Sequence, residues 1–316
     1  MKKLTLSLLL GSLAILPVPQ TLGMGRLGAM AAAAAAIAMQ SKKAETVFWG
    51  TGSVVIGSVN GNVGGDFYVV NGTKTVELGH TVGSGNRTTK TTAISGSPTK
   101  VDVSFGNVTI KQGTPPELVV HADDNIHKYL KQEITAKSIK LGLQENSYFT
   151  TENPIEYTLT LENMPNDLRA SGNSSITTPA IKVEQMKLIL SGQSKIYIPT
   201  LQAKKLAVEA SGQSSVRIPA VKTDTVSVDV SGQSDITLAG STNKQSVGCS
   251  GQSSYKAAEL KSGRTDIDVS GQSSGKVLAT EQVTGSVSGM SNLAIGGRPK
   301  PNVDVDVSGM SRWFFV

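Results

Sequence analysis

Two carboxylates at equivalent places in neighbouring repeats have the most suitable spacing for catalysis in this 316-residue chain. Glu209 and Asp229 each stand two residues before a Ser-Gly-Gln-Ser tetrapeptide. Stacked repeats would bring them to about 5 Å from each other, the carboxylate separation of retaining glycosidases. No outward aromatic residue that could stack on a sugar accompanies them. We therefore favour the interpretation that they are two solvated carboxylates on a strand face.

A second polar group, His121, Asp123, Asp124 and His127, has the residue types of a metal site or an acid–base site. It lies outside the repeats, and we interpret it as the polar surface of a loop. The single cysteine, Cys249, excludes an intrachain disulfide and a Cys-rich zinc cluster. No nucleophile elbow and no P-loop motif is present. The sequence therefore predicts no catalytic residue, no metal site and no cofactor.

The elements that would position these residues are defined by an internal repeat. A Ser-Gly-x-Ser tetrapeptide occurs eight times, at spacings of 20, 20, 20, 19, 20, 18 and 20 residues. The copies begin at Ser171, Ser191, Ser211, Ser231, Ser250, Ser270, Ser288 and Ser308. A repeat of this length is a unit that buries its apolar face only against its neighbours.

The residues that flank each tetrapeptide alternate between apolar and polar. In the copy at Ser231, residues 226–230 and 235–238 alternate with the period of two that is typical of strands. Two short strands joined by a glycine turn predict an all-β fold, a right-handed parallel β-helix (solenoid) with coils of about 20 residues. Seven steps of about 4.8 Å give an array about 34 Å long. A β-propeller is disfavoured because its blades take about 40–45 residues.

The third position of the tetrapeptide is an amide in six consecutive copies. It is Asn173 in the first copy and methionine in the last two copies. The glutamines between them are Gln193, Gln213, Gln233, Gln252 and Gln272. Amides at one level of a stacked β structure form a side-chain hydrogen-bond ladder. We interpret this ladder as a structural feature of the repeat and not as a ligand-binding site.

Residues 1–38 are predicted to be a secretory signal peptide, with cleavage after Gly23 or Ala38. Two lysines precede an uncharged apolar run, and small residues provide both cleavage sites. The alternative is an uncleaved membrane anchor from Leu4 to Leu22, which the prolines within it disfavour.

The net charge gives no indication of a nucleic-acid partner. The whole chain carries 30 basic and 24 acidic residues, a net charge of +6. The signal region contains Lys2, Lys3 and Arg26 and no acid, so the remaining chain carries 27 minus 24, or +3. This excess is too small to predict binding to nucleic acid.

Two segments separate the signal region from the repeats. Residues 39–98 are rich in Gly, Thr and Asn and are expected to form a lead-in of irregular coils or flexible chain. Alternating residues predict strands at 101–104, 107–110, 118–120 and 138–141, with a short helical turn within 123–130.

The upstream segment also resembles a known family. Val101 to Gly113, with the sequence VDVSFGNVTIKQG, and Leu118 to Ile126, with the sequence LVVHADDNI, look like the opening of the auto-transporter adhesin head GIN domain. The Ser-Gly-x-Ser repeats resemble the rest of that domain, so the resemblance covers residues 99–316. It implies a secreted or surface-exposed bacterial protein with a β-helical fold, a proposed adhesive role and no established enzymatic activity.

Together these observations predict an exported, non-enzymatic β-helix protein that acts as a binding module of the cell envelope or surface. The expected location is the periplasm, the outer surface or the extracellular space. The expected partner is a surface ligand such as a glycan or a matrix protein, with contact to the membrane only through the signal or an N-terminal anchor. The alternatives are a polysaccharide-degrading enzyme and a purely structural envelope protein that self-associates.

Overall fold

The computed structural model describes residues 44–50, 53–59, 66–71, 74–79 and 81–316. The predicted signal peptide, residues 1–38, lies outside these ranges. The chain divides into two compact units, one of residues 1–84 with 146–152 and one of residues 85–145 with 153–316. In the described ranges no helix is long and apolar enough to cross a membrane.

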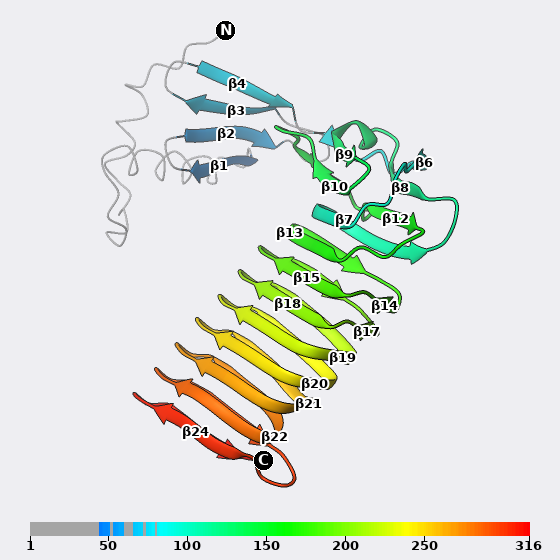
Figure 1. The fold of residues 1–316 in the computed structure, drawn as a ribbon. Helices are drawn as coiled ribbons and strands as arrows, with labels where there is room; N and C mark the ends of the chain where they lie inside the picture. Colours follow the sequence, from blue (N-terminus) through cyan, green and yellow to red (C-terminus); the bar gives the residue numbers. More distant parts are fainter. Residues whose placement is uncertain (1–43, 51–52, 60–65, 72–73, 80) are drawn as a thin grey trace, which may run out of the picture. The chain divides into compact units, whose positions relative to one another are not determined.

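The described part of the first unit contains two small sheets. One is an antiparallel sheet in which each strand pairs with the next along the chain (Figure 1). Its strands are β1 (Ala44–Gly50), β2 (Ser53–Val59), β3 (Asp66–Asn71) and β4 (Lys74–Gly79). The other sheet pairs β5 (Thr81–Val82) in parallel with β11 (Phe149–Thr150). The segment expected to be a lead-in therefore holds regular strands.

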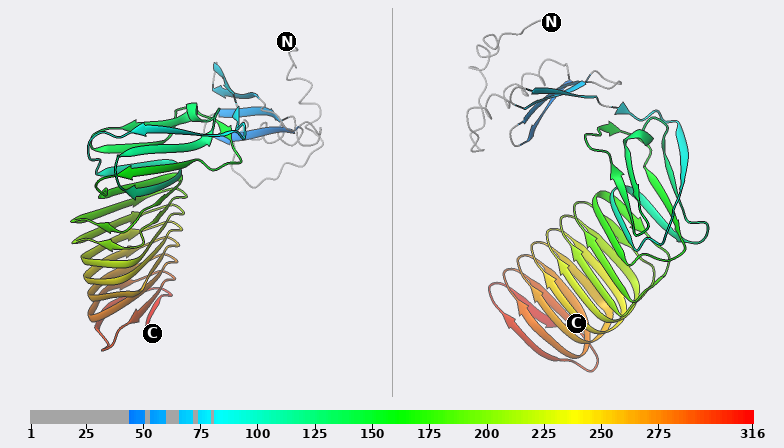
Figure 2. Two further views of the ribbon diagram at one scale, coloured as in Figure 1. Left: turned by 90° about the vertical axis from the view of Figure 1, so that its right-hand side faces the viewer. Right: turned by 45° about the horizontal axis from the view of Figure 1, so that its top comes forward.

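The second unit is a parallel β-solenoid, as the repeat predicts. Each coil pairs in register with the coils before and after it, so that Val208 lies beside Val228 and Val228 beside Val247. Figures 1 and 2 show the coils as one continuous stack. Its strands are β7 (Lys100–Gln112), β13 (Asp167–Thr177), β14 (Ile181–Lys182), β15 (Gln185–Leu190), β16 (Lys195–Tyr197), β17 (Leu201–Gln202), β18 (Lys205–Ala210), β19 (Ser215–Val230), β20 (Asp235–Cys249), β21 (Ser254–Val269), β22 (Ser274–Val287), β23 (Asn292–Gly296), β24 (Asn302–Val307) and β25 (Arg312–Phe315).

The apolar columns read from the sequence form the core. The residue before each tetrapeptide, and the second and fourth residues after it, are buried in the first seven copies. In the eighth copy the same positions are more open, with Val307 48% and Phe315 37% exposed. Because one strand residue in two points inward, each coil contributes a thin aliphatic layer that is covered by the next coil.

The tetrapeptide forms a turn that only glycine can occupy. Gly232 has a φ of +70°, and a Cβ built on it would lie 2.6 Å from the carbonyl oxygen of Gly212 in the preceding coil. The last serine of the tetrapeptide is buried and closes the turn, as when Ser214 Oγ donates to the carbonyl oxygen of Ser211 at 2.8 Å. The turns therefore stack by direct contact between their backbones.

Differences in coil length are absorbed at a corner far from this turn. The pairings of β19 with β20, β20 with β21 and β21 with β22 shift register only between residues that follow the second strand of the coil, for example between Ile218 and Val221. The tetrapeptides and their flanking strands therefore stay in register although the coils have 18 to 20 residues.

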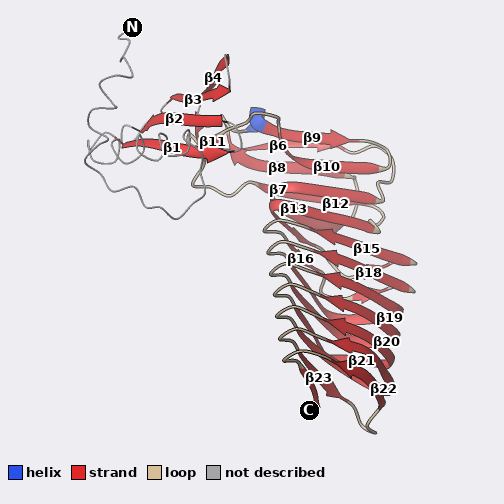
Figure 3. Cartoon of the chain, turned by 90° about the vertical axis from the view of Figure 1, so that its left-hand side faces the viewer, coloured by secondary structure: helices blue, strands red, loops and turns tan. Residues whose placement is uncertain are grey.

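Five further strands cover the N-terminal end of the stack (Figure 3). β10 (Ser138–Leu143) and β12 (Glu156–Leu161) both pair with β7 in parallel. Beyond them the pairing is antiparallel: β9 (Leu130–Ile134) pairs with β10, β8 (Glu117–Asp123) pairs with β12, and β6 (Arg87–Ala93) pairs with β8. A short 3-10 helix, His127–Tyr129, lies within the predicted helical turn. A covered strand edge cannot pair with another chain.

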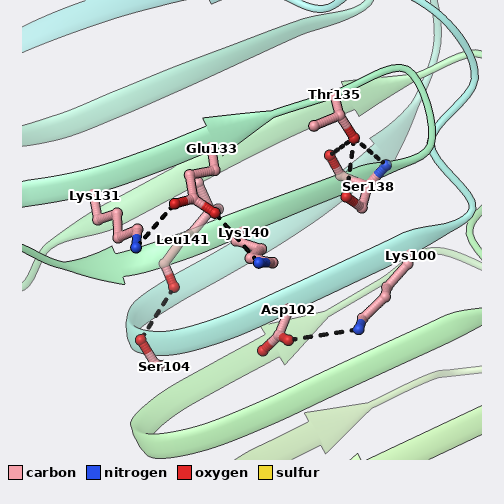
Figure 4. Close-up of polar contacts among 9 residues, drawn as sticks. All are labelled: Lys100, Asp102, Ser104, Lys131, Glu133, Thr135, Ser138, Lys140 and Leu141. Carbon is pink, nitrogen blue, oxygen red and sulfur yellow. Dashed lines mark hydrogen bonds and ion pairs between the residues drawn. The ribbon is translucent and has the colours of Figure 1, made fainter.

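Polar contacts hold these covering strands together (Figure 4). Glu133 lies 2.9 Å from Lys131 Nζ and 3.3 Å from Lys140 Nζ, so one carboxylate links two antiparallel strands. Ser104 Oγ donates to the carbonyl oxygen of Leu141 at 3.4 Å and joins β10 to the first coil.

One polar cluster lies inside the solenoid. Gln245 is fully buried in a column that continues from Val226 to Thr265, and its amide donates to Ser262 at 3.0 Å and to Thr265 at 2.9 Å and accepts from Tyr255 at 2.8 Å. Gly275 follows Tyr255 in the same column, and a Cβ there would contact Ile267, Val269 and Leu293 at 3.1–3.3 Å. All partners of this amide lie within the core, so the cluster is compatible with burial.

We expect Gly232→Ala to lower the free energy of unfolding by about 2–5 kcal/mol, from left-handed strain and overlap with the preceding coil. Gly85→Ala is the matched control, because Gly85 also has a positive φ, +75°, but a Cβ built on it would have no atom within 4 Å. Its cost should be only the strain of about 1–2 kcal/mol. Urea unfolding measures both, and equal losses would contradict the role of stacking contacts.

We expect Tyr255→Phe to cost about 1–3 kcal/mol of unfolding free energy, because Gln245 loses its buried donor. Tyr157→Phe is the control, since the Tyr157 hydroxyl is buried without a hydrogen-bond partner. That variant should be neutral or more stable. Thermal unfolding of both variants checks the prediction, and the reverse order would show that the buried cluster does not stabilise the core.

Candidate functional site

The outward residues of the solenoid form straight columns on both sides of the stacked turns. Because neighbouring coils pair in register, equivalent outward residues stand above one another at about 4.8 Å. Acidic residues gather in the column just before the turn, and basic residues gather in the columns just after it. The turn itself carries the glutamines.

The five glutamines are joined into a single ladder on the exposed surface. Each Nε2 donates to the Oε1 of the glutamine in the next coil, at distances of 3.2, 3.1, 3.0 and 3.3 Å from Gln193 to Gln272. The ladder therefore fixes the rotamers of these amides, and it forms a polar ridge between the acidic and the basic columns.

A shallow groove of about 550 Å³, here called the acidic groove, runs beside the ridge. Its walls are carboxylates of the column before the turn and the first serines of the tetrapeptides. The lining residues are Ile189, Leu190, Ser191, Glu209, Ala210, Ser211, Asp229, Val230, Ser231, Gly248, Cys249, Ser250, Asp268 and Ser270.

Glu209 and Asp229 lie side by side in this groove, as their spacing predicts. Both side chains are exposed, and Glu209 Oε1 lies 3.0 Å from Lys187 Nζ. Glycosidases keep their general acid in an apolar, buried setting. The arrangement in the groove lacks that setting and is a pair of solvated carboxylates, one of them ion-paired with Lys187.

Cys249 lies beneath the acidic groove and faces the core. Burial, with a smaller contribution from the nearby Asp229 carboxylate, raises the pKa of its thiol to about 12. A thiol in such surroundings is a small apolar side chain and not a nucleophile.

The group of His121, Asp123, Asp124 and His127 is divided among structural contacts. His121 Nδ1 is hydrogen-bonded to Thr89 Oγ1 at 2.9 Å, and His127 Nε2 to Thr88 Oγ1 at 3.0 Å. These bonds join β8 and the 3-10 helix to β6.

Burial lowers the pKa of His127. The Asp123 carboxylate is 2% exposed and accepts hydrogen bonds from Asn153 Nδ2 at 3.0 Å and from the Gly85 amide at 3.3 Å. The described residues contain no group of three or more potential ligands that could hold a metal ion. The expectation of an ordinary polar loop is therefore wrong for Asp123 and His127, because both are buried.

The columns after the turn form a surface that the sequence reasoning did not single out, here called the basic face. Its cations are Lys195, Arg217, Lys256, Lys276 and Arg312, all exposed. Its one acidic residue, Asp235, is in an ion pair with Lys256. The sequence does contain a pattern that identifies this face, because all five cations occupy the first or third position after a tetrapeptide.

The basic face also carries exposed aromatic rings. Tyr197 is 39% exposed, and Phe314, in the last coil of the same column, is 42% exposed, whereas Tyr255 is fully buried. Tyr197 stands directly beside Arg217 of the next coil. Tyr197 follows a tetrapeptide whereas Glu209 and Asp229 precede one, so the acidic pair gives no indication of this ring in the sequence.

A second groove, of about 410 Å³, lies at another corner of the coils. One of its columns alternates in charge through Glu184, Lys204 and Asp224, and Lys204 Nζ lies 2.7 Å from Glu184. Neutralised charges of this kind are typical of an exposed surface.

These features define a β-solenoid that presents long, regular polar surfaces. Residues 97–299 match the family described as "Putative auto-transporter adhesin, head GIN domain", and the chain belongs to this family.

Solved structures of the same fold cover most of the chain. Two are described as putative adhesins, from Parabacteroides distasonis ATCC 8503 (TM-score 0.69, 17% identity) and Parabacteroides merdae ATCC 43184 (TM-score 0.68, 18% identity). Each covers 75% of this chain, and the match spans 100% and 99% of their own lengths. A third, described as a putative lipid binding protein from P. distasonis, has the same TM-score and identity as the second. No curated protein matches the sequence.

We expect Cys249 to resist thiol reagents in the native protein at about pH 8, because the thiol is buried and its thiolate is suppressed. Reaction should become complete in denaturant. Spectroscopic titration with an aromatic disulfide reagent measures both states. Rapid reaction of the native protein would show that the floor of the acidic groove opens.

Proposed function

We propose that this protein is an exported, non-enzymatic binding module of the cell envelope or surface, and that it binds a surface ligand along the length of its solenoid. The observation that carries the proposal is the in-register stacking of exposed polar side chains over successive coils. A ligand with repeating groups can contact many coils at once.

Such binding suits a rigid scaffold. The turns are fixed by backbone contacts and the ridge amides by mutual hydrogen bonds, so the turns and the ridge lose little freedom when a ligand binds. Several weak contacts on one rigid surface then add up to a specific interaction. The adhesin descriptions of the family and of its solved relatives support the same role and an export to the surface.

Two other functions remain as competitors. A polysaccharide-degrading enzyme would use Glu209 and Asp229, but the exposure of both and the ion pair of Glu209 disfavour it. A purely structural envelope protein would explain the solenoid but not the separation of acidic and basic columns. The binding module explains both features.

The test is a binding array of glycans and matrix proteins, with the full chain expressed in a bacterial host and recovered from the envelope or the medium. We expect saturable binding to a limited set of ligands. Absence of binding to every ligand, or confinement of the chain to the cytoplasm, would contradict the proposal. The same protein should release no sugar fragments, and release that Glu209→Gln or Asp229→Asn abolishes would establish the enzyme instead.

A further inference from the structure

We propose that the basic face binds a linear acidic polysaccharide, and that Tyr197, Arg217 and Lys195 form a subsite for one of its uronate residues. This inference rests on the proposed function and names the ligand class and the surface. It is carried by three independent observations: the charge of the face, the exposed ring and the direction of the columns.

The charge of the face favours an anion. Five cations stand against one acidic residue, and Lys256 already neutralises that residue. Lys195, Arg217 and Lys276 form no ion pair with any residue that the structure describes. Lys276 stands directly beside Lys256 in register, so the cations of this column continue into the next coil. A bound anion would supply the partner that the unpaired cations lack.

The ring of Tyr197 supplies a flat apolar surface where the free charges lie. Its neighbours in the same column are Thr177 and Arg217, and Lys195 is two residues before it on the same side of β16. An aromatic ring beside a guanidinium can contact the apolar side of a sugar while the guanidinium meets its carboxylate. The planar fork of arginine matches a carboxylate with two parallel hydrogen bonds.

The direction of the columns indicates a polymer that lies along the solenoid axis. From Tyr197 the column continues through Arg217, Thr237 and Lys256 to Lys276, about 19 Å away over four coil steps. A peptide in this direction would cross the strands at their faces and could add no strand to the sheet, so its main chain would go unrecognised. A sugar chain needs no strand edge, because its hydroxyls and carboxylates are recognised by side chains.

The acidic groove restricts the ligand to one side of the ridge. Glu209, Asp229 and Asp268 line the groove across the stacked turns, so a polyanion is repelled there and attracted on the basic face. Screening by salt weakens both effects.

The experiment measures binding of a short oligogalacturonate to the full chain by calorimetry, with a neutral cello-oligosaccharide and polyphosphate as comparison ligands. We expect binding of the galacturonate and none of the neutral sugar. Arg217→Ala should raise the Kd about tenfold, the loss expected for a charge-assisted pair of hydrogen bonds. Tyr197→Ala should raise it about fivefold, and Arg217→Lys should lie between wild type and Arg217→Ala.

Lys222→Ala is the matched control, because Lys222 is an exposed cation in the same coil as Arg217 but lies beyond the next corner. Its Kd should stay within about twofold of wild type. All the substituted side chains point outward, so thermal unfolding should show unchanged stability.

Three outcomes would overturn the inference. The first is binding of array ligands but not of galacturonate, which leaves the proposed function standing and removes the uronate subsite. The second is equal weakening by Lys222→Ala and Arg217→Ala, and the third is polyphosphate binding as tight as galacturonate with no effect of Tyr197→Ala. Both of these would show attraction by net charge alone. Failure to bind any ligand on the array would instead defeat the proposed function itself.

Discussion

Contact between the glycines of successive turns is the constraint on which the rest of the structure depends. With Gly232 above Gly212 and Gly212 above Gly192, a Cβ on any one of them would come within 3.0 Å of the backbone of the coil before it. The turns can therefore lie one above another only at the spacing of backbone hydrogen bonds. This fixed spacing aligns the inward columns into a core and the outward columns into rows of charge.

The fold was predictable from the sequence because the repeat has both a period and an alternation. The tetrapeptide spacing predicted the solenoid, and the alternation identified buried residues as different as Tyr255 and Cys249. The covering strands and the burial of Gln245 were less accessible. β8 and β12 pair without a repeat to reveal it, and the buried Gln245 is satisfied only by partners from the next coil, β21.

The surface residues were also only partly predictable from the sequence. Reasoning from pairs of residues found Glu209 and Asp229, and the structure does place them together. It overlooked Tyr197, Arg217 and Lys276, whose relation appears only when equivalent positions are compared down the whole stack. In a repeat protein of this kind, a ligand contacts a column of equivalent residues from many coils. Here the ridge of glutamines separates the acidic column from the basic columns.

The corner where the register shifts is the part of the coil that tolerates a change in length. Coils of 18, 19 and 20 residues differ only there, between the second strand and the return to the next coil. The position of each coil is therefore set at the tetrapeptide turn, while the number of residues in the coil can vary at the opposite corner. Evolution can lengthen or shorten a coil at this corner without moving a single column. The same property makes the corner the natural place to graft a foreign loop for display.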